Sequence, residues 1–429
     1  RKARKNNGAK RDMHYEMEQE EHDVYPDDPD FDINKARLVT TAPRICVRYE
    51  CVPMRFIKHV YKIHTYAQDG RLFEGKTPVS AFLNSSYDGS FIAGLMELRY
   101  IQSLPVERII NYFESHGFTL KKPTAHKLME KASSLFENLY KCIRQTALSD
   151  PYKAADETYY KILVPEKNSK GKGVRKGYLW VVVGINTRMI YLLYDDGSRS
   201  EKVILNELGG CKGIIQSDGY SPYRKLESDA YPHITRIPCL QHIKRKFIDC
   251  GEDDPDAKRI VEMINTLYQN EHKHKIGVDG WTVEQNLVHR KKYAPDILGE
   301  IKDVLDDIEE RGDLLPKSEL KEAVTYLRNE WNAVVDIFNY GDTYLDNNIV
   351  ERMNRYISLS RKNSLFFGSH KGAERGAILY TIALTCRMNK VNLFEYLTDV
   401  INRTAEWQPN TPLEKYRLLL PDRWEKAND

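Results

Sequence analysis

The spacing of hydrophobic positions changes several times along the chain. Residues 37–72 carry Val, Ile, Tyr and Phe between basic residues, which predicts a small β-rich module. Residues 90–149 change to helical spacing, and residues 150–239 return to strand-like runs. Between 249 and 335 the strand pattern vanishes, and helical spacing continues towards the C-terminus. The pattern therefore predicts a mixed α/β protein with a separate, all-helical insertion.

Two helices joined by a glycine turn are predicted between residues 90 and 149. The first begins at Leu104-Pro105-Val106-Glu107 and ends at His116-Gly117, where Gly suits the position just past a helix C-terminus. The second follows Lys121 and Lys122. Its apolar stripe consists of Leu128, Leu135 and Leu139. Helix, turn and basic helix start fit a DNA-binding helix-turn-helix, and an ordinary helical hairpin is the alternative.

Five strands are predicted after residue 150. They are residues 152–164, 177–184, 189–194, 213–220 and 234–239, and the run 213–220 ends in a turn at Asp218-Gly219. The first three form an antiparallel meander, and the later ones alternate with helices, the last running into a helix over 241–247. Three antiparallel strands followed by strand–helix alternation is the order of an RNase H-like sheet. In such a sheet the first and fourth strands lie side by side at the centre.

The insertion and the segment that follows it are predicted to be helical. The insertion helices are residues 260–268, 283–292, 297–310 and 320–338. The next helix starts with Asp346 or Asn347 as its N-cap. Its buried face consists of Ile349, Met353 and Ile357. Glu351 and Arg355 share another face, so Glu351 is either a metal ligand or half of an exposed i,i+4 ion pair.

These patterns divide the chain into seven segments. They are a flexible basic and acidic segment (1–35), a small β-rich module (36–89), a helical helix-turn-helix region (90–149), the first part of an RNase H-like core (150–248), a helical insertion (249–335), the second part of the core (336–403) and a C-terminal tail (404–429). The fold class is thus α/β, with C-terminal helices after the core.

Composition narrows the class further. The chain has 429 residues and a net charge of only +3, although 30% of residues are charged, so basic and acidic runs are segregated. No apolar run approaches the roughly 20 residues of a membrane-spanning helix. Seven cysteines without a Cys-x-x-Cys pair argue against a disulfide scaffold. Cys46 and Cys51 are too widely spaced for the usual zinc knuckle, so zinc is not expected there.

Three carboxylates stand where metal-dependent phosphoryl transfer requires them. Asp156 lies on the first predicted strand and Asp218 ends the fourth, so we expect the two to face each other. Two carboxylates this close repel, and a divalent metal keeps both ionised. Glu351 supplies a third oxygen ligand suited to Mg²⁺ if its helix returns to the sheet. Two such metals about 4 Å apart activate a hydroxyl nucleophile and stabilise the leaving oxygen. Taken singly, each Asp is more often a solvated residue or a turn former.

The same residues resemble a known family, the IS66-family transposases. Its three acidic motifs are similar to Asp156-Glu157-Thr158, Gln216-Ser217-Asp218-Gly219-Tyr220 and Asn347-Asn348-Ile349-Val350-Glu351-Arg352. Further similar motifs, in the same order as in the family, are Leu104-Pro105-Val106-Glu107-Arg108, Gly177-Tyr178-Leu179-Trp180, the run from Ser360 to Ser369 and Leu419-Leu420-Pro421-Asp422-Arg423-Trp424. The resemblance extends from about Cys51 to Trp424.

The resemblance implies a DDE transposase that cuts and joins the ends of a bacterial insertion sequence with Mg²⁺ or Mn²⁺. Asp156, Asp218 and Glu351 then take the positions of the catalytic, metal-binding acids. The implied partners are the terminal inverted repeats and target DNA, a second copy of the chain when ends are paired, and small accessory proteins of the same element. The implied location is the bacterial cytoplasm, at the nucleoid.

Further residues are expected to support the site or bind DNA. Cys239-Leu240-Gln241-His242 resembles a Cys-x-x-His motif found after the second Asp in several DDE families. A supporting role at the site is favoured about equally with the alternative, in which Cys239 is a buried core thiol and His242 a surface imidazole. Asn347 and Asn348 belong to the third motif. The expected phosphate contacts are Lys121, Lys122, Lys127, Arg352, Arg355, Arg361 and Lys362.

One departure from the family and two rival readings remain. Relatives commonly carry Cys-x-x-Cys pairs before the helix-turn-helix, and residues 66–72 contain no Cys, so zinc in that module is not expected. The chain begins at Arg1 without a Met and is expected to be a fragment if relatives' longer N-terminal regions apply. The rivals are a catalytically inactive DNA-binding derivative and an RNase H-like nuclease.

Overall fold

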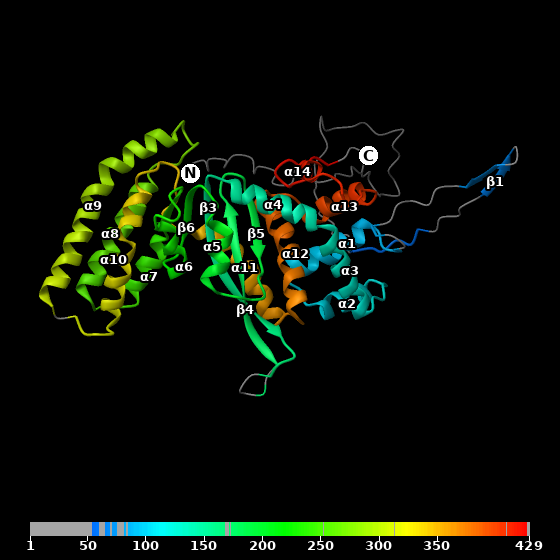
Figure 1. Cartoon of the computed structure of the whole chain (residues 1–429), viewed down its shortest axis with the longest axis horizontal. Coiled ribbons are helices and arrows are strands. Elements are labelled where there is room, and N and C mark those ends of the chain that lie inside the picture. The colour runs from blue at the N-terminus through cyan, green and yellow to red at the C-terminus, as the bar shows by residue number, and fades with distance from the viewer. Residues whose placement is uncertain are drawn as a thin grey trace, which may run out of the picture. The chain divides into compact units, whose positions relative to one another are not determined.

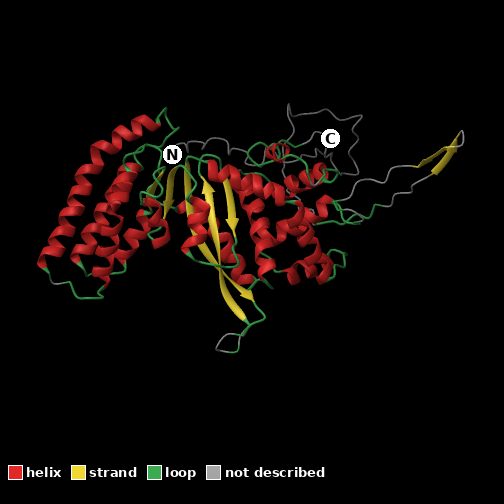
Figure 2. Ribbon diagram, viewed as in Figure 1, coloured by secondary structure: helices red, strands yellow, loops and turns green. Residues whose placement is uncertain are grey.

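A computed structural model of the chain shows a mixed α/β protein with one five-stranded sheet and many helices (Figures 1 and 2). Residues 55–429 pack as one unit. The structure describes residues 54–59, 65–68, 71–74, 81–82, 85–167, 171, 173–251, 253–312, 314–408 and 410–426. Cys46 and Cys51, considered above for zinc, lie outside these residues.

The central sheet has the strand order β5-β4-β3-β6-β7. The strands are β3 (Tyr152–Leu163), β4 (Val174–Gly184), β5 (Met189–Leu193), β6 (Gly213–Ser217) and β7 (Ile234–Pro238). The first three pair antiparallel, whereas β6 is parallel to both β3 and β7. The predicted meander and the side-by-side placement of the first and fourth strands are therefore confirmed. β4 begins three residues earlier than predicted because its pairing with β3 continues to Val174.

The edge strand β5 is covered by a long buried helix, α12 (His370–Met388). Two threonines of α12 bond the β5 backbone, since Leu192 N donates to Thr381 Oγ1 at 2.9 Å and Thr385 Oγ1 donates to Ile190 O at 2.9 Å. These side chains satisfy strand groups that an open edge would leave to solvent. Covering the edge in this way ties α12 firmly to the sheet.

The helices before the sheet follow the predicted pattern with one correction. They are α1 (Gly89–Met96), η1 (Glu97–Ile101), α2 (Val106–Ser115), α3 (Lys122–Leu135) and α4 (Glu137–Ser149). α2 ends as predicted, with Gly117 in the left-handed region at φ 82°. The predicted second helix is two helices, because the chain breaks at the fully buried Phe136. Before them, the structure describes a hairpin of β1 (Thr65–Gln68) and β2 (Arg71–Glu74).

The segment after β7 is helical, as predicted. It contains α7 (Leu240–Ile248), α8 (Pro255–Glu271), α9 (Val283–Arg311) and α10 (Glu319–Ile337). α9 corrects the prediction of two helices, because it runs through Pro295 without ending. A continuous buried stripe along α9, including Ala294, Leu298 and Ile301, packs against neighbouring helices and compensates for the hydrogen bond that Pro removes.

The helix predicted to carry the third acid is α11 (Asn348–Asn363), followed after α12 by α13 (Leu393–Thr404) and α14 (Leu413–Arg417). The N-cap of α11 is Asn347, but the side chain of Asp346 makes the capping bond, because it accepts from Asn348 N at 3.1 Å. The buried face is shifted from the predicted one. It consists of Val350, Ile357 and Ser360, while Ile349 and Met353 are half-buried.

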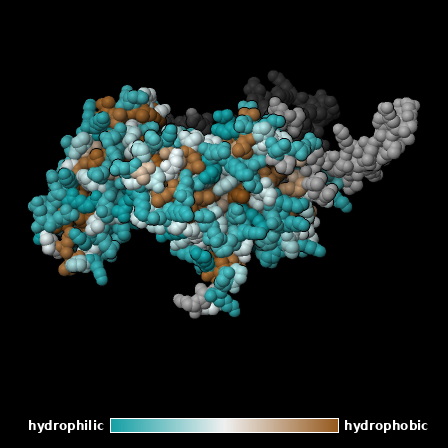
Figure 3. Space-filling model, in the orientation of Figure 1, coloured by the Kyte–Doolittle hydropathy of each residue, from teal (hydrophilic) through white to brown (hydrophobic). Residues whose placement is uncertain are grey.

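Three short elements connect the strands, namely α5 (Glu201–Leu208), α6 (Ser221–Arg224) and η2 (Lys225–Glu227). Among the described residues, no helix is long and apolar enough to cross a membrane. The face seen in Figure 3 is largely hydrophilic, with separate hydrophobic patches.

Candidate active site

Asp156 lies on β3, and Asp218 directly follows the neighbouring strand β6. In the parallel pairing of β3 with β6, Tyr152 lies opposite Ile214 and Ala154 opposite Gln216. If this register is continued by two more residues, past the end of β6, Asp156 comes level with Asp218. Side chains two residues apart on a strand point to the same face. Asp218 itself lies past the end of β6, and its charge is close enough to Asp156 to raise the pKa of that carboxyl group.

The carboxyl group of Asp156 is held in a way that disfavours its charge. Burial raises its pKa to about 7, and the nearby charges of Glu157 and Asp218 add to the rise. Two hydrogen bonds oppose it, from Glu157 N to Oδ1 at 2.8 Å and from Asn354 Nδ2 to Oδ2 at 2.7 Å. A carboxylate placed among other carboxylates and pre-oriented by two donors is suited to a cation, and its oxygen atoms suit Mg²⁺.

The loop that carries Asp218 is held by the helical insertion. Tyr220 N donates to Asp218 Oδ1 at 3.1 Å, and Gly219 N donates to the hydroxyl of Tyr326 in α10 at 2.8 Å. A Cβ at Gly219 would lie 2.5–2.7 Å from the oxygen and ring of Tyr326. The buried Arg236 also donates to Asp218 O at 3.1 Å and pairs with Glu330 of α10. Neither Tyr326 nor Glu330 was predicted.

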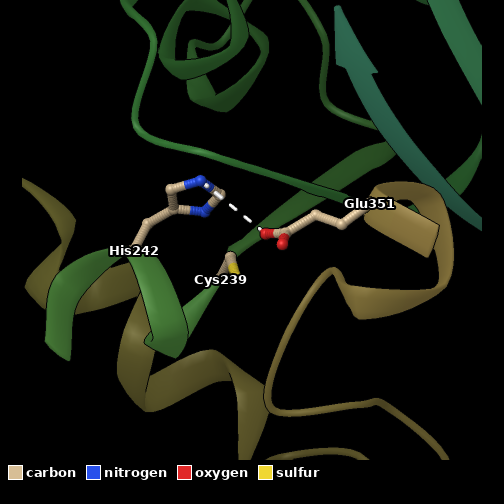
Figure 4. Close-up of side chains that lie close together, drawn as sticks. All are labelled: Cys239, His242 and Glu351. Carbon is tan, nitrogen blue, oxygen red and sulfur yellow. Dashed lines mark ion pairs between the residues drawn. The ribbon is translucent and has the colours of Figure 1, made fainter. Parts of the chain in front are cut away.

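Glu351 lies beside the Cys-x-x-His motif rather than midway between the two Asp residues. Its Oε1 is 3.8 Å from His242 Nε2, and the ligand atoms of Cys239, His242 and Glu351 all lie within 4.8 Å of one another (Figure 4). Among the described residues, the three acids form no group this close. However, Asn354, one turn along α11 from Glu351, bonds Asp156. The helix therefore reaches the first strand, while the carboxylate of Glu351 points to His242.

The two readings of Glu351 left by the sequence are now distinguishable. Among the ion pairs of the described residues, Glu351 pairs with His242 and not with Arg355. Its Oε1 atom is buried and has no hydrogen-bond partner within that part of the chain. The exposed i,i+4 ion pair is therefore wrong, and a buried carboxylate oxygen remains for a ligand.

The other residues of the motifs fasten α11 to the sheet. Asn347 Nδ2 donates to Ala155 O at 2.9 Å, and Asn347 N donates to Cys239 Sγ at 3.2 Å. Burial raises the pKa of Cys239 to about 12, so the thiol stays neutral near pH 7. Asn348 is half-buried and donates its backbone N–H to Asp346. Cys239 and Asn347 thus fix the start of α11 against β3 at Ala155, the residue before Asp156.

The residues predicted to contact DNA differ in their exposure and in whether they already pair with other side chains or the backbone. Lys121, the N-cap of α3, and Lys127 within α3 are exposed, and the exposed Lys122 pairs with Glu107 at 2.6 Å. On α11 three of the four predicted residues, Arg352, Arg355 and Lys362, are exposed. The fourth, Arg361, is half-buried and donates to Tyr159 O and to Thr158 Oγ1.

Comparison with known proteins gives the context for this geometry. Residues 84–375 match the family model described as "Transposase IS66 family". Three uncharacterized proteins of Sinorhizobium fredii are also similar. The chain is 25% identical to y4jD, covering 77% of this chain and 65% of y4jD. It is 24% identical to y4hP, covering 92% and 76%, and 26% identical to y4qI, covering 86% and 69%.

Proposed function

The chain belongs to the IS66 family of transposases, and on that basis we propose that it is a DDE transposase. It would bind insertion-sequence ends and catalyse metal-dependent DNA strand cleavage and strand transfer. Family membership implies DNA as the partner. The observation that supports the chemistry is the register that levels Asp156 with Asp218, together with the bond from Asn354 of α11 to Asp156.

Asp156, Asp218 and Glu351 would hold Mg²⁺ or Mn²⁺. When bound, such ions activate a water or a DNA 3′-hydroxyl and stabilise the leaving oxygen. The buried Oε1 of Glu351, which accepts no hydrogen bond, and the raised pKa of Asp156 both fit a bound cation. Glu351 would turn from His242 towards the Asp pair, and His242 would keep its carboxylate in reach in the meantime. Asn354 and Glu157 N orient the Asp156 oxygens.

The finer fold assignments form part of the proposal. We assign the sheet with β3 and β6 at its centre to an RNase H-like core, on the strand order and directions. The helices from α8 to α10 are then an insertion within that core. We assign α2, the turn at Gly117 and α3 to a helix-turn-helix, whose exposed Lys121 and Lys127 would contact phosphates.

Partners beyond DNA follow from the reaction. Two DNA ends must be brought together before they are joined, so we propose at least a dimer during transposition. Small accessory proteins of the same element and location at the nucleoid are proposed on the family resemblance alone.

The rival functions are separated by one pair of measurements. Asp218→Asn should abolish cleavage of end DNA while leaving binding to it largely intact, because the loop backbone and the DNA-binding helices are unchanged. A catalytically inactive derivative would bind without cleaving in the wild type. An RNase H-like nuclease would cleave without preference for the ends. Unchanged cleavage by Asp218→Asn would refute the assignment.

A further inference from the structure

A continuous row of alternating cations and aromatic rings crosses β3 and β4, from α11 at one end to the loop after β6 at the other. We call it the cation–aromatic ladder, and its members in order are Arg361, Tyr159, Lys176, Tyr178, Arg199 and Tyr220. Arg361 and Lys176 lie 3.8 and 4.3 Å from the Tyr159 ring centre, Lys176 and Arg199 lie 5.2 and 5.1 Å from that of Tyr178, and Arg199 lies 4.2 Å from that of Tyr220. Each neighbouring pair is within the range of a cation–π contact.

The ladder follows from the register of the sheet. Tyr159 and Tyr178 lie directly opposite each other on β3 and β4, so their rings share one face. β6 pairs only with the first residues of β3. Beyond that point β3 and β4 continue together as a hairpin (Figure 1). The edge of β3 left open by β6 is reached by Arg361, which donates to Tyr159 O. At the other end, the Tyr220 hydroxyl donates to Arg199 O at 3.1 Å.

Both ends of the ladder lie on the elements that carry the candidate acids. Arg361 belongs to α11, the helix of Glu351. Tyr220 follows Asp218 by two residues, and its backbone N–H donates to the Asp218 carboxylate at 3.1 Å. Tyr159 is three residues from Asp156 on β3, so its ring lies on the opposite face of the sheet from the Asp156 carboxylate. The ladder therefore approaches the candidate acids only at its two ends, Arg361 and Tyr220.

The charges along the ladder are largely uncompensated. Lys161 and Lys176 are exposed and lie directly opposite each other, an arrangement of like charges that destabilises a strand pair. Among the ion pairs of the described residues, neither lysine has a carboxylate partner, whereas Arg199 pairs with Glu157. Facing lysines without a counter-charge are explained by a polyanion that contacts both.

We propose that the cation–aromatic ladder, with Lys161, binds the sugar–phosphate backbone of duplex DNA on the face of the β3–β4 pair opposite to the Asp156 carboxylate. This inference rests on the proposed function and adds a DNA contact outside the candidate acids. The rings hold the long cationic side chains in place, so less side-chain freedom is lost on binding. Backbone contacts of this kind are independent of sequence and sensitive to salt.

The test is the affinity of the full chain for a fluorescent duplex of arbitrary sequence, measured over a range of salt concentrations. Lys161→Gln with Lys176→Gln should lower affinity roughly tenfold and reduce the slope of log K against log salt by about 1.8, which corresponds to two lost phosphate contacts. The matched control is Lys291→Gln with Lys302→Gln, a pair of exposed lysines on α9. It should change affinity less than about twofold.

A second pair of variants tests the role of the rings. Tyr178→Leu removes a ring between Lys176 and Arg199 but no charge, and should weaken binding severalfold, whereas Tyr178→Phe should retain wild-type affinity. If the ladder and α9 double variants lose the same amount of DNA affinity, or if neither loses any, the ladder proposal is overturned. The transposase proposal is judged separately, and it stands if the wild type cleaves end DNA. Failure of the wild type to bind any duplex would overturn both.

Discussion

Replacing Asp156 with Asn should stabilise the metal-free protein, and more so as pH rises. The pKa of Asp156 is raised to about 7 from 3.8, chiefly by burial. Between these values the folded protein binds a proton that the unfolded chain does not, so this group lowers stability as pH rises from about 4 to about 7. Asn cannot ionise and escapes this cost. The bond from Asn354 lowers the pKa of Asp156, so its pH-dependent effect is already included in the value of about 7.

The magnitude follows from the width of the window. From about pH 5 to about pH 7, two pH units correspond to at most about 2.7 kcal/mol of stability that wild type loses and Asp156→Asn keeps. Asp156 retains some solvent contact, which makes this figure an upper limit. Thermal unfolding in EDTA at about pH 5 and about pH 8 measures the difference. Asp303→Asn, an exposed Asp on α9, is the control and should show no pH-dependent gain. Identical pH profiles for wild type and Asp156→Asn would refute the reasoning.

Two further changes test how the acids are positioned. Gly219→Ala should slow cleavage roughly tenfold, because its Cβ would displace the Tyr326 ring. In a Tyr326→Ala background the ring is absent, so adding Gly219→Ala should cause little further loss. Single-turnover cleavage rates of the two single variants and the double variant measure this, and additive effects would show that the contact is unimportant. Asn354→Ala removes a bond that lowers the pKa of Asp156 and should raise the Mg²⁺ concentration needed for half-maximal cleavage roughly tenfold, with an unchanged Mg²⁺ titration as the contrary result.

The sheet and the two Asp residues were predictable because their signals are local. Strand-like runs of apolar residues mark β3 to β7, and the order of strands fixes which two become neighbours. With β3 and β6 adjacent, Asp156 on β3 and Asp218 just past β6 come close enough for the charge of Asp218 to raise the pKa of Asp156. The end of α2 was also predictable, since Gly117 takes a left-handed conformation that few other residues adopt.

The remaining features depend on tertiary packing that sequence spacing does not encode. Pro295 normally ends a helix, and only the packing of α9 against its neighbours carries the helix through. The hydroxyl of Tyr326 reaches Gly219 across 107 residues, and no pattern in either segment indicates it. The position of Glu351 beside His242 is of the same kind, because it depends on how α7 and α11 meet.

The central claim is that Glu351 acts with Asp156 and Asp218 on DNA. The most direct measurement is cleavage of labelled element-end duplex in Mg²⁺ or Mn²⁺ by wild type and by Glu351→Gln, with binding to the same duplex recorded in parallel. We predict that wild type nicks the terminus, and that the variant binds equally well but cleaves roughly 100-fold more slowly or not at all. Full cleavage by the variant would show that the third acid lies elsewhere and contradict the account.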